Sequence, residues 1–200
     1  MTKIEKENIE MRNEDLKVEI ISDALKGVKI GLCITGGIAA LESYKIARHL
    51  RRHGADVTAY MTPCALKFLT PMALEWATEK DVITEMSGRA EHICLEDLIV
   101  IAPATLNTIN KIFAGIGDNI VTTLVASALG KKVPVYIAPC MHDSLYKNPI
   151  FQDNLKKSEE YRIKVIEPRF SENKAKIANL MTITDSVLKY FKENPKLVLK

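Results

Sequence analysis

The sequence predicts an α/β domain in which helices cover both faces of a mostly parallel β-sheet. Short apolar runs without helical periodicity alternate along the chain with amphipathic segments of helical spacing. Runs of the first kind are typical of strands buried on both faces, and segments of the second kind are typical of helices that cover such a sheet. Strands that alternate with helices form crossover units, which bring successive strands parallel into one sheet.

The first strand and helix follow this pattern. Residues 28–34 (VKIGLCI) form an apolar run that ends at the Thr-Gly-Gly of residues 35–37, as a buried strand ends at a turn. The next segment places apolar side chains at steps of four, three and three residues, at Ala40, Tyr44, Ala47 and Leu50. This spacing predicts an amphipathic helix that ends near Gly54.

The same alternation continues towards the end of the chain. It predicts further strands at residues 56–61, 98–102, 133–137 and 163–166. It predicts further helices at residues 64–77, 107–114, 121–129 and about 183–193.

Length and composition favour one domain for these elements. The chain has 200 residues, of which 47% are hydrophobic, and this is enough for a single buried core. Residues 1–26 are polar and dense in charge, so we expect an N-terminal arm or helix there. The domain itself is expected at residues 27–193, with a tail at 194–200.

Charge and hydropathy exclude several classes of partner. The 28 Lys and Arg residues against 25 Asp and Glu residues leave a net charge of +3, which does not favour nucleic acid as a partner. No stretch approaches the roughly 20 apolar residues of a membrane span. The N-terminus carries charges where a signal peptide needs its apolar run. We therefore expect a cytoplasmic protein with no membrane partner.

The cysteines do not form a metal or disulfide motif. Cys33, Cys64, Cys94 and Cys140 are widely spaced, with no C-x-x-C pair among them. We expect reduced and mostly buried thiols, and no zinc site.

The loops that follow the strands are the places where such a sheet binds ligands. Residues 35–39 (Thr-Gly-Gly-Ile-Ala) follow the first strand and open a helix. Their backbone N–H groups can hold a phosphate, or the glycines can simply serve a tight turn. The dinucleotide pattern G-x-G-x-x-G is absent, which disfavours NAD as the ligand. A mononucleotide with one phosphate remains a candidate ligand.

Three further segments carry polar groups. Residues 102–108 (APATLNT) place Thr105, Asn107 and Thr108 at the start of a helix, where Thr105 or Asn107 can also serve as an ordinary cap. Residues 139–149 are rich in functional groups, and His92 stands shortly before a strand. A lone histidine is more often a surface residue than a catalytic one.

Five segments taken together resemble one known family. They are ITGGIAALESYKIARHLRRHGADV, MTPCALKFLTPMALE, GRAEHI, IAPATLNTINKIFAGIGDNIVTT and APCMHDSLYKNP. The chain resembles the flavin-dependent cysteine decarboxylases from about Val28 to Ile183, and within them the phosphopantothenoylcysteine decarboxylase domain of coenzyme A biosynthesis in its archaeal form. The family usually has serine at the position of Gly37.

This resemblance implies a three-layer, Rossmann-like flavoprotein with a mostly parallel sheet. It implies FMN as the cofactor, bound by residues that match the family's contacts: Gly36, Gly37, Ile38, Thr62, Thr105, Leu106, Asn107, Thr108 and Met141. His92 matches the family's catalytic histidine, and His142 matches the residue that binds the substrate carboxylate. The resemblance also implies a homotrimer or homododecamer, with FMN and active site between subunits.

The activity implied is decarboxylation of a small, phosphorylated cysteinyl substrate. In the family, flavin oxidises the substrate's thiol towards a thioaldehyde, the neighbouring carboxylate leaves as CO2, and the reduced flavin returns the electrons. An imidazole suits proton transfer near neutral pH, as expected of His92, and His142 can donate a hydrogen bond to the carboxylate. Lys147 and Arg169 are candidates to attract the phosphorylated substrate.

Besides Gly37, the chain departs from the family pattern in two places. The segment HICLEDLIVIAP after His92 is shorter than in the family. Many members have a cysteine in a late flap, and the matching residues 168–176 contain none, which leads to the hypothesis that Cys140 or Cys94 replaces it. Three alternatives stay open. The first is a flavin reductase or electron-transfer protein, for which a pterin is one candidate substrate. The others are a flavin prenyltransferase and a non-catalytic FMN-binding regulatory subunit.

Overall fold

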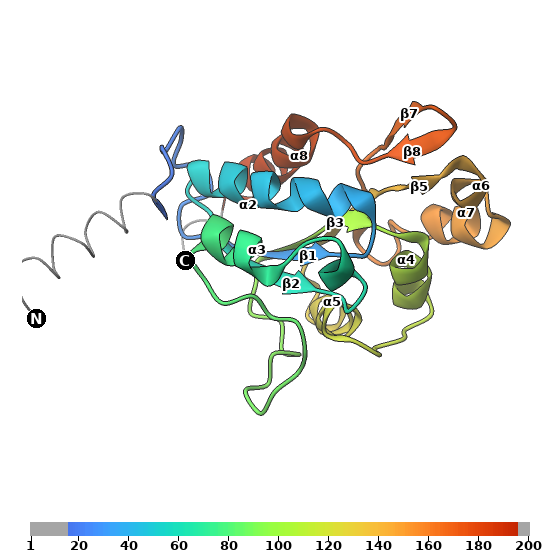
Figure 1. The fold of residues 1–200 in the computed structure, drawn as a ribbon, viewed down its shortest axis with the longest axis horizontal. Coiled ribbons are helices and arrows are strands. Elements are labelled where there is room, and N and C mark those ends of the chain that lie inside the picture. Colours follow the sequence, from blue (N-terminus) through green and yellow to red (C-terminus); the bar gives the residue numbers. More distant parts are fainter. Residues whose placement is uncertain (1–15, 196–200) are drawn as a thin grey trace, which may run out of the picture.

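A computed structural model describes residues 16–195 of the chain. Its main sheet has five strands in the order β2-β1-β3-β4-β6, and every neighbouring pair is parallel (Figure 1). The strands are β1 (Lys29–Ile34), β2 (Asp56–Met61), β3 (Leu98–Ala104), β4 (Val135–Pro139) and β6 (Ile163–Val165). The predicted fold class and all five predicted strands are therefore confirmed, with ends that differ by two residues at most.

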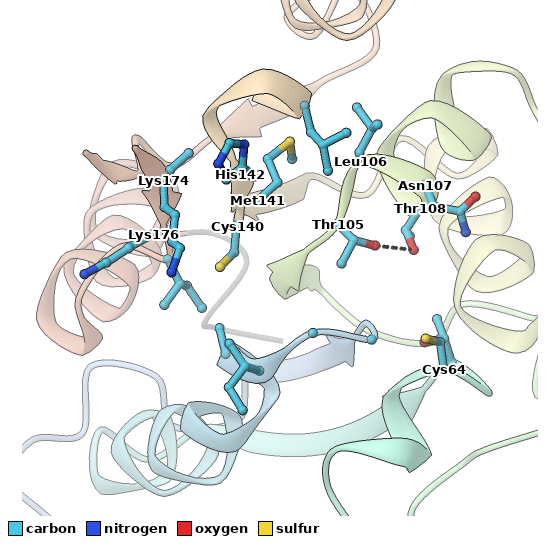
Figure 2. A pocket seen from close by; sticks show the side chains of 18 of the residues that line it. Cys64, Thr105, Leu106, Asn107, Thr108, Cys140, Met141, His142, Lys174 and Lys176 are labelled. Atoms are coloured by element: carbon cyan, nitrogen blue, oxygen red, sulfur yellow. Dashed lines mark hydrogen bonds between the residues drawn. The ribbon is translucent and has the colours of Figure 1, made fainter. Parts of the chain in front are cut away.

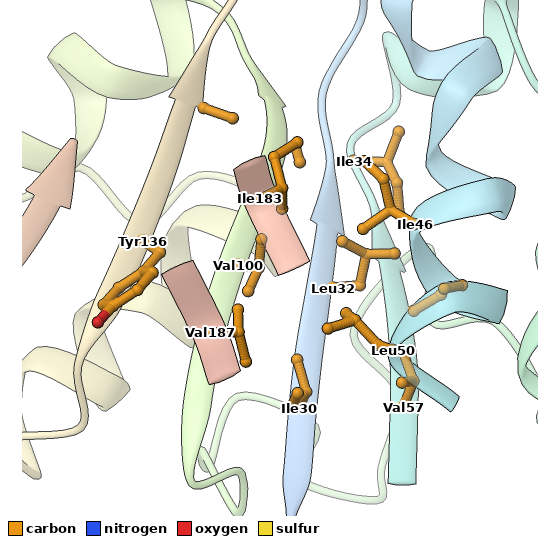
Figure 3. Packing of buried hydrophobic residues seen from close by; sticks show 14 of the residues in the cluster. Ile30, Leu32, Ile34, Ile46, Leu50, Val57, Val100, Tyr136, Ile183 and Val187 are labelled. Atoms are coloured by element: carbon orange, nitrogen blue, oxygen red, sulfur yellow. The ribbon is translucent and has the colours of Figure 1, made fainter. Parts of the chain in front are cut away.

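Alternation along the buried strands divides the core between the two faces of the sheet. Ile30, Leu32 and Val100 face one side and pack against α2 (Ser43–Arg52), α3 (Pro71–Thr78) and α8 (Leu180–Glu193), as Figure 3 shows for α2 and α8. Cys33 and Ile101 face the other side and pack against α4 (Leu106–Phe113), α5 (Ile120–Gly130) and α7 (Pro149–Lys156). Successive side chains of a strand point to opposite faces of the sheet, and helices cover both faces. The domain therefore has three layers.

The predicted helix at 64–77 is wrong in one respect, because the structure divides it. A short 3₁₀ helix, η2 (Ala65–Lys67), is separated from α3 by Thr70, whose backbone is extended (φ −78°, ψ 148°). A residue that precedes proline is pushed out of the helical region, and Pro71 follows here. A second 3₁₀ helix, η1 (Ile38–Glu42), precedes α2.

A small second sheet was not expected from the sequence. Its strands are β5 (Met141–His142), β7 (Arg169–Ser171) and β8 (Lys174–Lys176), in the antiparallel order β5-β8-β7. The β7–β8 pair is a hairpin, and Glu172 and Asn173 at its turn both have positive φ. Between β5 and α7 lies the short helix α6 (Asp143–Tyr146).

The N-terminal segment is attached to the domain from residue 17 onwards, where the carbonyl of Lys17 accepts from Arg48 Nη2 at 3.2 Å. The N–H groups of Ile21 and Leu25 donate to carbonyl oxygens of Arg52 and His53 at the end of α2, at 2.8 Å each. Leu25 is fully buried in the first core cluster. Most of the predicted arm (1–15) and of the tail (196–200) lies outside the described residues, and the boundary at 26/27 stays a prediction. Among residues 16–195, no helix is long and apolar enough to span a membrane.

Candidate active site

A cavity of about 890 Å³ lies at the carboxyl ends of the main strands, between the main sheet and the small sheet (Figure 2). The loops after β1, β2, β3 and β4 all contribute to its lining. The lining includes His142 and every residue that the sequence predicted for the cofactor, namely Gly36, Gly37, Ile38, Thr62, Thr105, Leu106, Asn107, Thr108 and Met141. Gly36 and His142, 106 positions apart in the sequence, thus line one cavity.

One wall of the cavity presents backbone amides. Thr105 is the N-cap of α4 but its side chain accepts no hydrogen bond from the helix. The helical ladder begins with the N–H of Ile109 donating to the carbonyl of Thr105 at 3.0 Å, so the N–H groups of Leu106, Asn107 and Thr108 have no carbonyl within the helix. Free amides at a helix N-terminus favour an anion. We call residues 36–38 with residues 105–108 the amide wall.

The buried hydroxyl of Thr35 joins the two loops of the amide wall. Its Oγ1 donates to the carbonyl of Pro103 at 2.8 Å and accepts from the N–H of Thr105 at 3.0 Å. Ser43, the first residue of α2, ties that helix to β3, because its Oγ donates to the carbonyl of Ala102 at 2.9 Å. Both side chains are fully buried, so the hydrogen bonds that join the two loops and hold α2 against β3 are protected from water.

Gly36 and Gly37 differ in the space around them. A Cβ atom on Gly36 would lie 2.3 Å from Sγ and 2.9 Å from the backbone carbonyl carbon of Cys64, which no real side chain allows. A Cβ on Gly37 would lie 3.8 Å from Cγ2 of Thr105, an ordinary contact. Glycine is therefore required at 36 for the close approach of the loop after β2, and the serine usual in the family at 37 has room here.

Thr62 fixes the loop after β2 against this wall. It is nearly buried, its N–H donates to the carbonyl of Ile34 at 3.0 Å, and its Oγ1 accepts from the N–H of Ala65 at 3.2 Å. Lys111 and Asp118, which also line the cavity, form an ion pair between α4 and the segment before α5. The run K-x-x-x-G-I-x-D-N was visible in the sequence, but nothing in it showed that these two charges face a ligand site.

The opposite wall is the small sheet, and it is cationic. Arg169, Lys174 and Lys176 of the β7–β8 hairpin all line the cavity, and Figure 2 shows the two lysines on the side away from Thr105 and Thr108. Of these cations, the sequence singled out Arg169 alone. Lys147, the other candidate, lies outside the lining and pairs with Asp143. We call Arg169, Lys174 and Lys176 the hairpin cations.

His142 belongs to β5 of the small sheet and is the N-cap of α6. Its Nδ1 accepts a hydrogen bond from the N–H of Ser144 at 3.2 Å. Because a backbone N–H can only donate, the neutral ring carries its proton on Nε2. The side chain is exposed to the cavity, so Nε2–H is available as a donor to a ligand.

The structure separates the two cysteines proposed to replace the flap cysteine. Cys140 lines the cavity, and burial raises the pKa of its thiol, although a backbone hydrogen bond with Ile177 and the charge of Arg169 act in the opposite direction. Cys94 is buried away from the cavity, and burial raises the pKa of its thiol to about 11. The expectation of mostly buried thiols is wrong for Cys64, which is exposed in the cavity beside Gly36.

His92 is not brought to the cavity of its own chain. It is exposed on the segment between α3 and β3, which stands away from the body of the domain (Figure 1). The base of this segment is anchored, because the hydroxyl of Tyr60 donates to the buried carboxylate of Glu96 at 2.5 Å and the N–H of Cys94 donates to Ser127 Oγ at 3.0 Å. Burial, followed by the hydrogen bond to Glu96, raises the pKa of Tyr60 well above its usual value.

Known proteins of similar sequence cover most of this chain. The chain is 44% identical over 182 residues to the coenzyme A biosynthesis bifunctional protein CoaBC of Thermococcus kodakarensis, covering 88% of this chain but 44% of the relative. It is 34% identical over 151 residues to a probable phosphopantothenoylcysteine decarboxylase of Streptococcus mutans, covering 72% of this chain and 84% of the relative. The chain thus spans less than half the length of the bifunctional relative.

A solved structure of peptidyl-cysteine decarboxylase EpiD superposes with a TM-score of 0.71 at 26% identity, covering 80% of this chain and 98% of that one. The family model described as Flavoprotein matches residues 19–192, which include both walls of the cavity and the segment that carries His92. The chain belongs to the Flavoprotein family.

Proposed function

We propose that this protein is an FMN-dependent carboxy-lyase that decarboxylates a cysteinyl substrate. The substrate we propose is phosphopantothenoylcysteine, which becomes phosphopantetheine in coenzyme A biosynthesis. The observation that carries the proposal is the single cavity that gathers nine matched cofactor residues and His142 at the strand ends. The names of the relatives that are 44% and 34% identical point to the same reaction.

The cavity suits FMN in charge, shape and size. The free amides of the amide wall suit its phosphate, and the apolar side chains of Ile38, Leu106 and Met141 suit a flat ring system. A volume of about 890 Å³ lies near the upper end of ordinary ligand pockets, so it has room for a cofactor and part of a substrate. The proposed cofactor residues are those matched from the sequence, with Cys64 as an additional neighbour.

The chain's own task is to orient the substrate and manage protons. FMN, when bound, supplies the oxidation of the cysteinyl thiol and the later return of two electrons. The Nε2–H of His142 is placed to donate a hydrogen bond to the substrate carboxylate and so hold it in the cavity. His92 is proposed to transfer protons, since an imidazole can both donate and accept near neutral pH.

The position of His92 supports an active site that is completed by a second subunit. Because the side chain is exposed and does not line the cavity of its own chain, we propose that it enters the cavity of a neighbour in a homotrimer, which can assemble further into a homododecamer. Exposed apolar side chains on the same segment, Ile93 and Leu95, are suited to burial at such an interface. The proposal includes the cytoplasmic location expected from the sequence.

The test is anaerobic incubation of the purified protein with phosphopantothenoylcysteine, following CO2 release and the flavin absorbance together. We expect a yellow protein that releases one CO2 per substrate consumed. A yellow protein that releases no CO2, and whose flavin is instead rapidly reduced by a nicotinamide, would contradict the decarboxylase and favour the reductase alternative. A protein that binds flavin and does neither would favour the regulatory subunit.

A further inference from the structure

Strand register places the hairpin cations on one face of the small sheet. Arg169 is paired with Lys176 and Ser171 is paired with Lys174 across the β7–β8 ladder. Directly paired residues, and residues two apart on one strand, share a face. Arg169, Lys174 and Lys176 therefore share one face, and all of them line the cavity.

Two of these cations have no ion-pair partner in the part of the chain that the structure describes. Glu172, at the hairpin turn, pairs with Lys176 at 2.6 Å and is also close enough to Lys174 for that charge to contribute to its lowered pKa. Arg169 donates from Nε to the carbonyl of Ile177 at 3.0 Å, and this contact fixes the guanidinium. Within residues 16–195, neither Arg169 nor Lys174 forms an ion pair.

The cavity offers little negative charge to balance them. Asp118 is the one carboxylate among the lining residues that the structure describes, and it is paired with Lys111 on the side of α4 and α5. The hairpin cations thus create a positive region on one wall, and the free amides at the start of α4 create a separate one on the other (Figure 2). FMN has one phosphate, and that phosphate can occupy only one of these two positive regions.

We propose that Arg169 and Lys174, assisted by Lys176, bind the phosphate monoester of the substrate and thereby select a phosphorylated small molecule over an unphosphorylated or peptidyl cysteine. This inference rests on the proposed function and adds the residues that determine substrate specificity. A phosphate monoester carries close to two negative charges at neutral pH. The fixed fork of Arg169 suits two phosphate oxygens, and Lys174 adds a point charge beside it.

The ladder also suggests what the competing role of Lys174 would be. Lys174 is paired directly with His142 of β5, so the two Cβ atoms are about 5 Å apart. In the competing role, Lys174 would bind the substrate carboxylate together with His142. A carboxylate is present in every cysteinyl substrate, whereas the phosphate is present in one class, so the two roles predict different kinetics.

The experiment measures kcat and KM of the flavin-loaded protein for phosphopantothenoylcysteine and for pantothenoylcysteine, which lacks the phosphate. The variants are Arg169→Ala, Lys174→Ala and Glu172→Gln, with Lys156→Ala as the control because Lys156 is an exposed lysine that pairs with Asp153 on α7. For Arg169→Ala and Lys174→Ala we expect kcat/KM for the phosphorylated substrate to fall about tenfold each, chiefly through KM. We expect kcat/KM for pantothenoylcysteine to change less than about twofold.

Glu172→Gln provides a variant with an effect of opposite sign. Because it removes the carboxylate that holds Lys176, we expect a lower KM for the phosphorylated substrate and no change for the unphosphorylated one. Lys156→Ala should change kcat and KM for neither substrate. Raised ionic strength should increase the KM of the phosphorylated substrate in the wild type more than in Lys174→Ala.

Three outcomes would overturn the inference. Equal losses on both substrates would assign the cations to the carboxylate, loss of bound flavin would assign them to the FMN phosphate, and unchanged kinetics would remove them from binding altogether. Failure of the proposed function is a separate result, since a wild type that decarboxylates neither substrate would show it before any variant is made.

Discussion

The two walls of the cavity are built in different ways. The amide wall is formed by the loops that follow the buried strands β1 and β3, and the fully buried hydroxyl of Thr35 joins these two loops. The opposite wall, which we call the hairpin wall, consists of the three-residue strands β7 and β8, whose cations are largely exposed and of whose six residues only Ala175 is buried.

This difference suits the two walls to different ligands. Backbone amides fixed by the core give a ligand site that changes little with side-chain substitution, as suits a cofactor that stays bound. Exposed side chains on a hairpin can be exchanged without cost to the core, as suits the choice of a substrate. His92 belongs to neither wall.

His92→Asn should produce the largest loss of activity. The asparagine side chain can form hydrogen bonds but cannot take up or release a proton near neutral pH. General acid–base catalysis contributes about 10²- to 10⁴-fold to turnover. Because His92 is not among the residues proposed to bind FMN, we expect flavin content to stay at the wild-type level. Turnover and flavin absorbance are measured on the same sample, and full activity would show that the chemistry does not use His92.

Gly36→Ala should produce the largest loss of flavin binding, by about 100-fold or more in Kd. The added Cβ meets Cys64 at 2.3 Å from Sγ and 2.9 Å from a backbone carbon, so a loop of the amide wall has to move. Gly37→Ala is the matched control, because the same atom added there meets nothing closer than 3.8 Å. Fluorescence titration of FMN gives both values, and similar affinities in the two variants would contradict this account of the amide wall.

Asn107→Asp should weaken flavin binding by about tenfold. The substitution keeps the shape of the side chain but places a negative charge in the first turn of α4, next to the amides proposed to hold the phosphate. The matched control is Asn107→Ser, which is uncharged. If both variants bind FMN equally, the phosphate is held elsewhere.

Thr35→Val should have the smallest effect, and on stability rather than chemistry. It leaves the carbonyl of Pro103 and the N–H of Thr105 without a partner, which costs about 1–3 kcal/mol of unfolding free energy. Thr123→Val is the control, since the buried hydroxyl of Thr123 has no hydrogen-bond partner in the described part of the chain. Urea unfolding of both variants measures the difference, and equal stabilities would show that Thr35 does not join the two loops.

The sequence predicts the main sheet well because its signal is local. Apolar runs such as residues 98–102 have few alternatives to a buried strand, and β3 indeed spans Leu98–Ala104 with every residue buried. The small sheet gave no such signal. Its strands β7 and β8 have three residues each, and of these six only Ala175 is buried, so neither apolar runs nor alternation marks them.

The same reasoning explains which parts of the site were found. The residues of the amide wall lie in compact motifs after strands, where resemblance and strand-end geometry both point to them. The close approach of Gly36 to Cys64 and the convergence of Lys174 and Lys176 on the cavity depend on tertiary packing between segments far apart in sequence. No local pattern encodes such contacts.

The central claim is that the amide wall holds the cofactor and the hairpin wall holds the substrate. Titration of FMN into the flavin-free form of the wild type, Gly36→Ala and the double variant Arg169→Ala/Lys174→Ala tests it most directly. The account predicts a wild-type Kd for the double variant, within about twofold, and a loss of about 100-fold for Gly36→Ala. A double variant that loses FMN as severely as Gly36→Ala would contradict the division between the two walls.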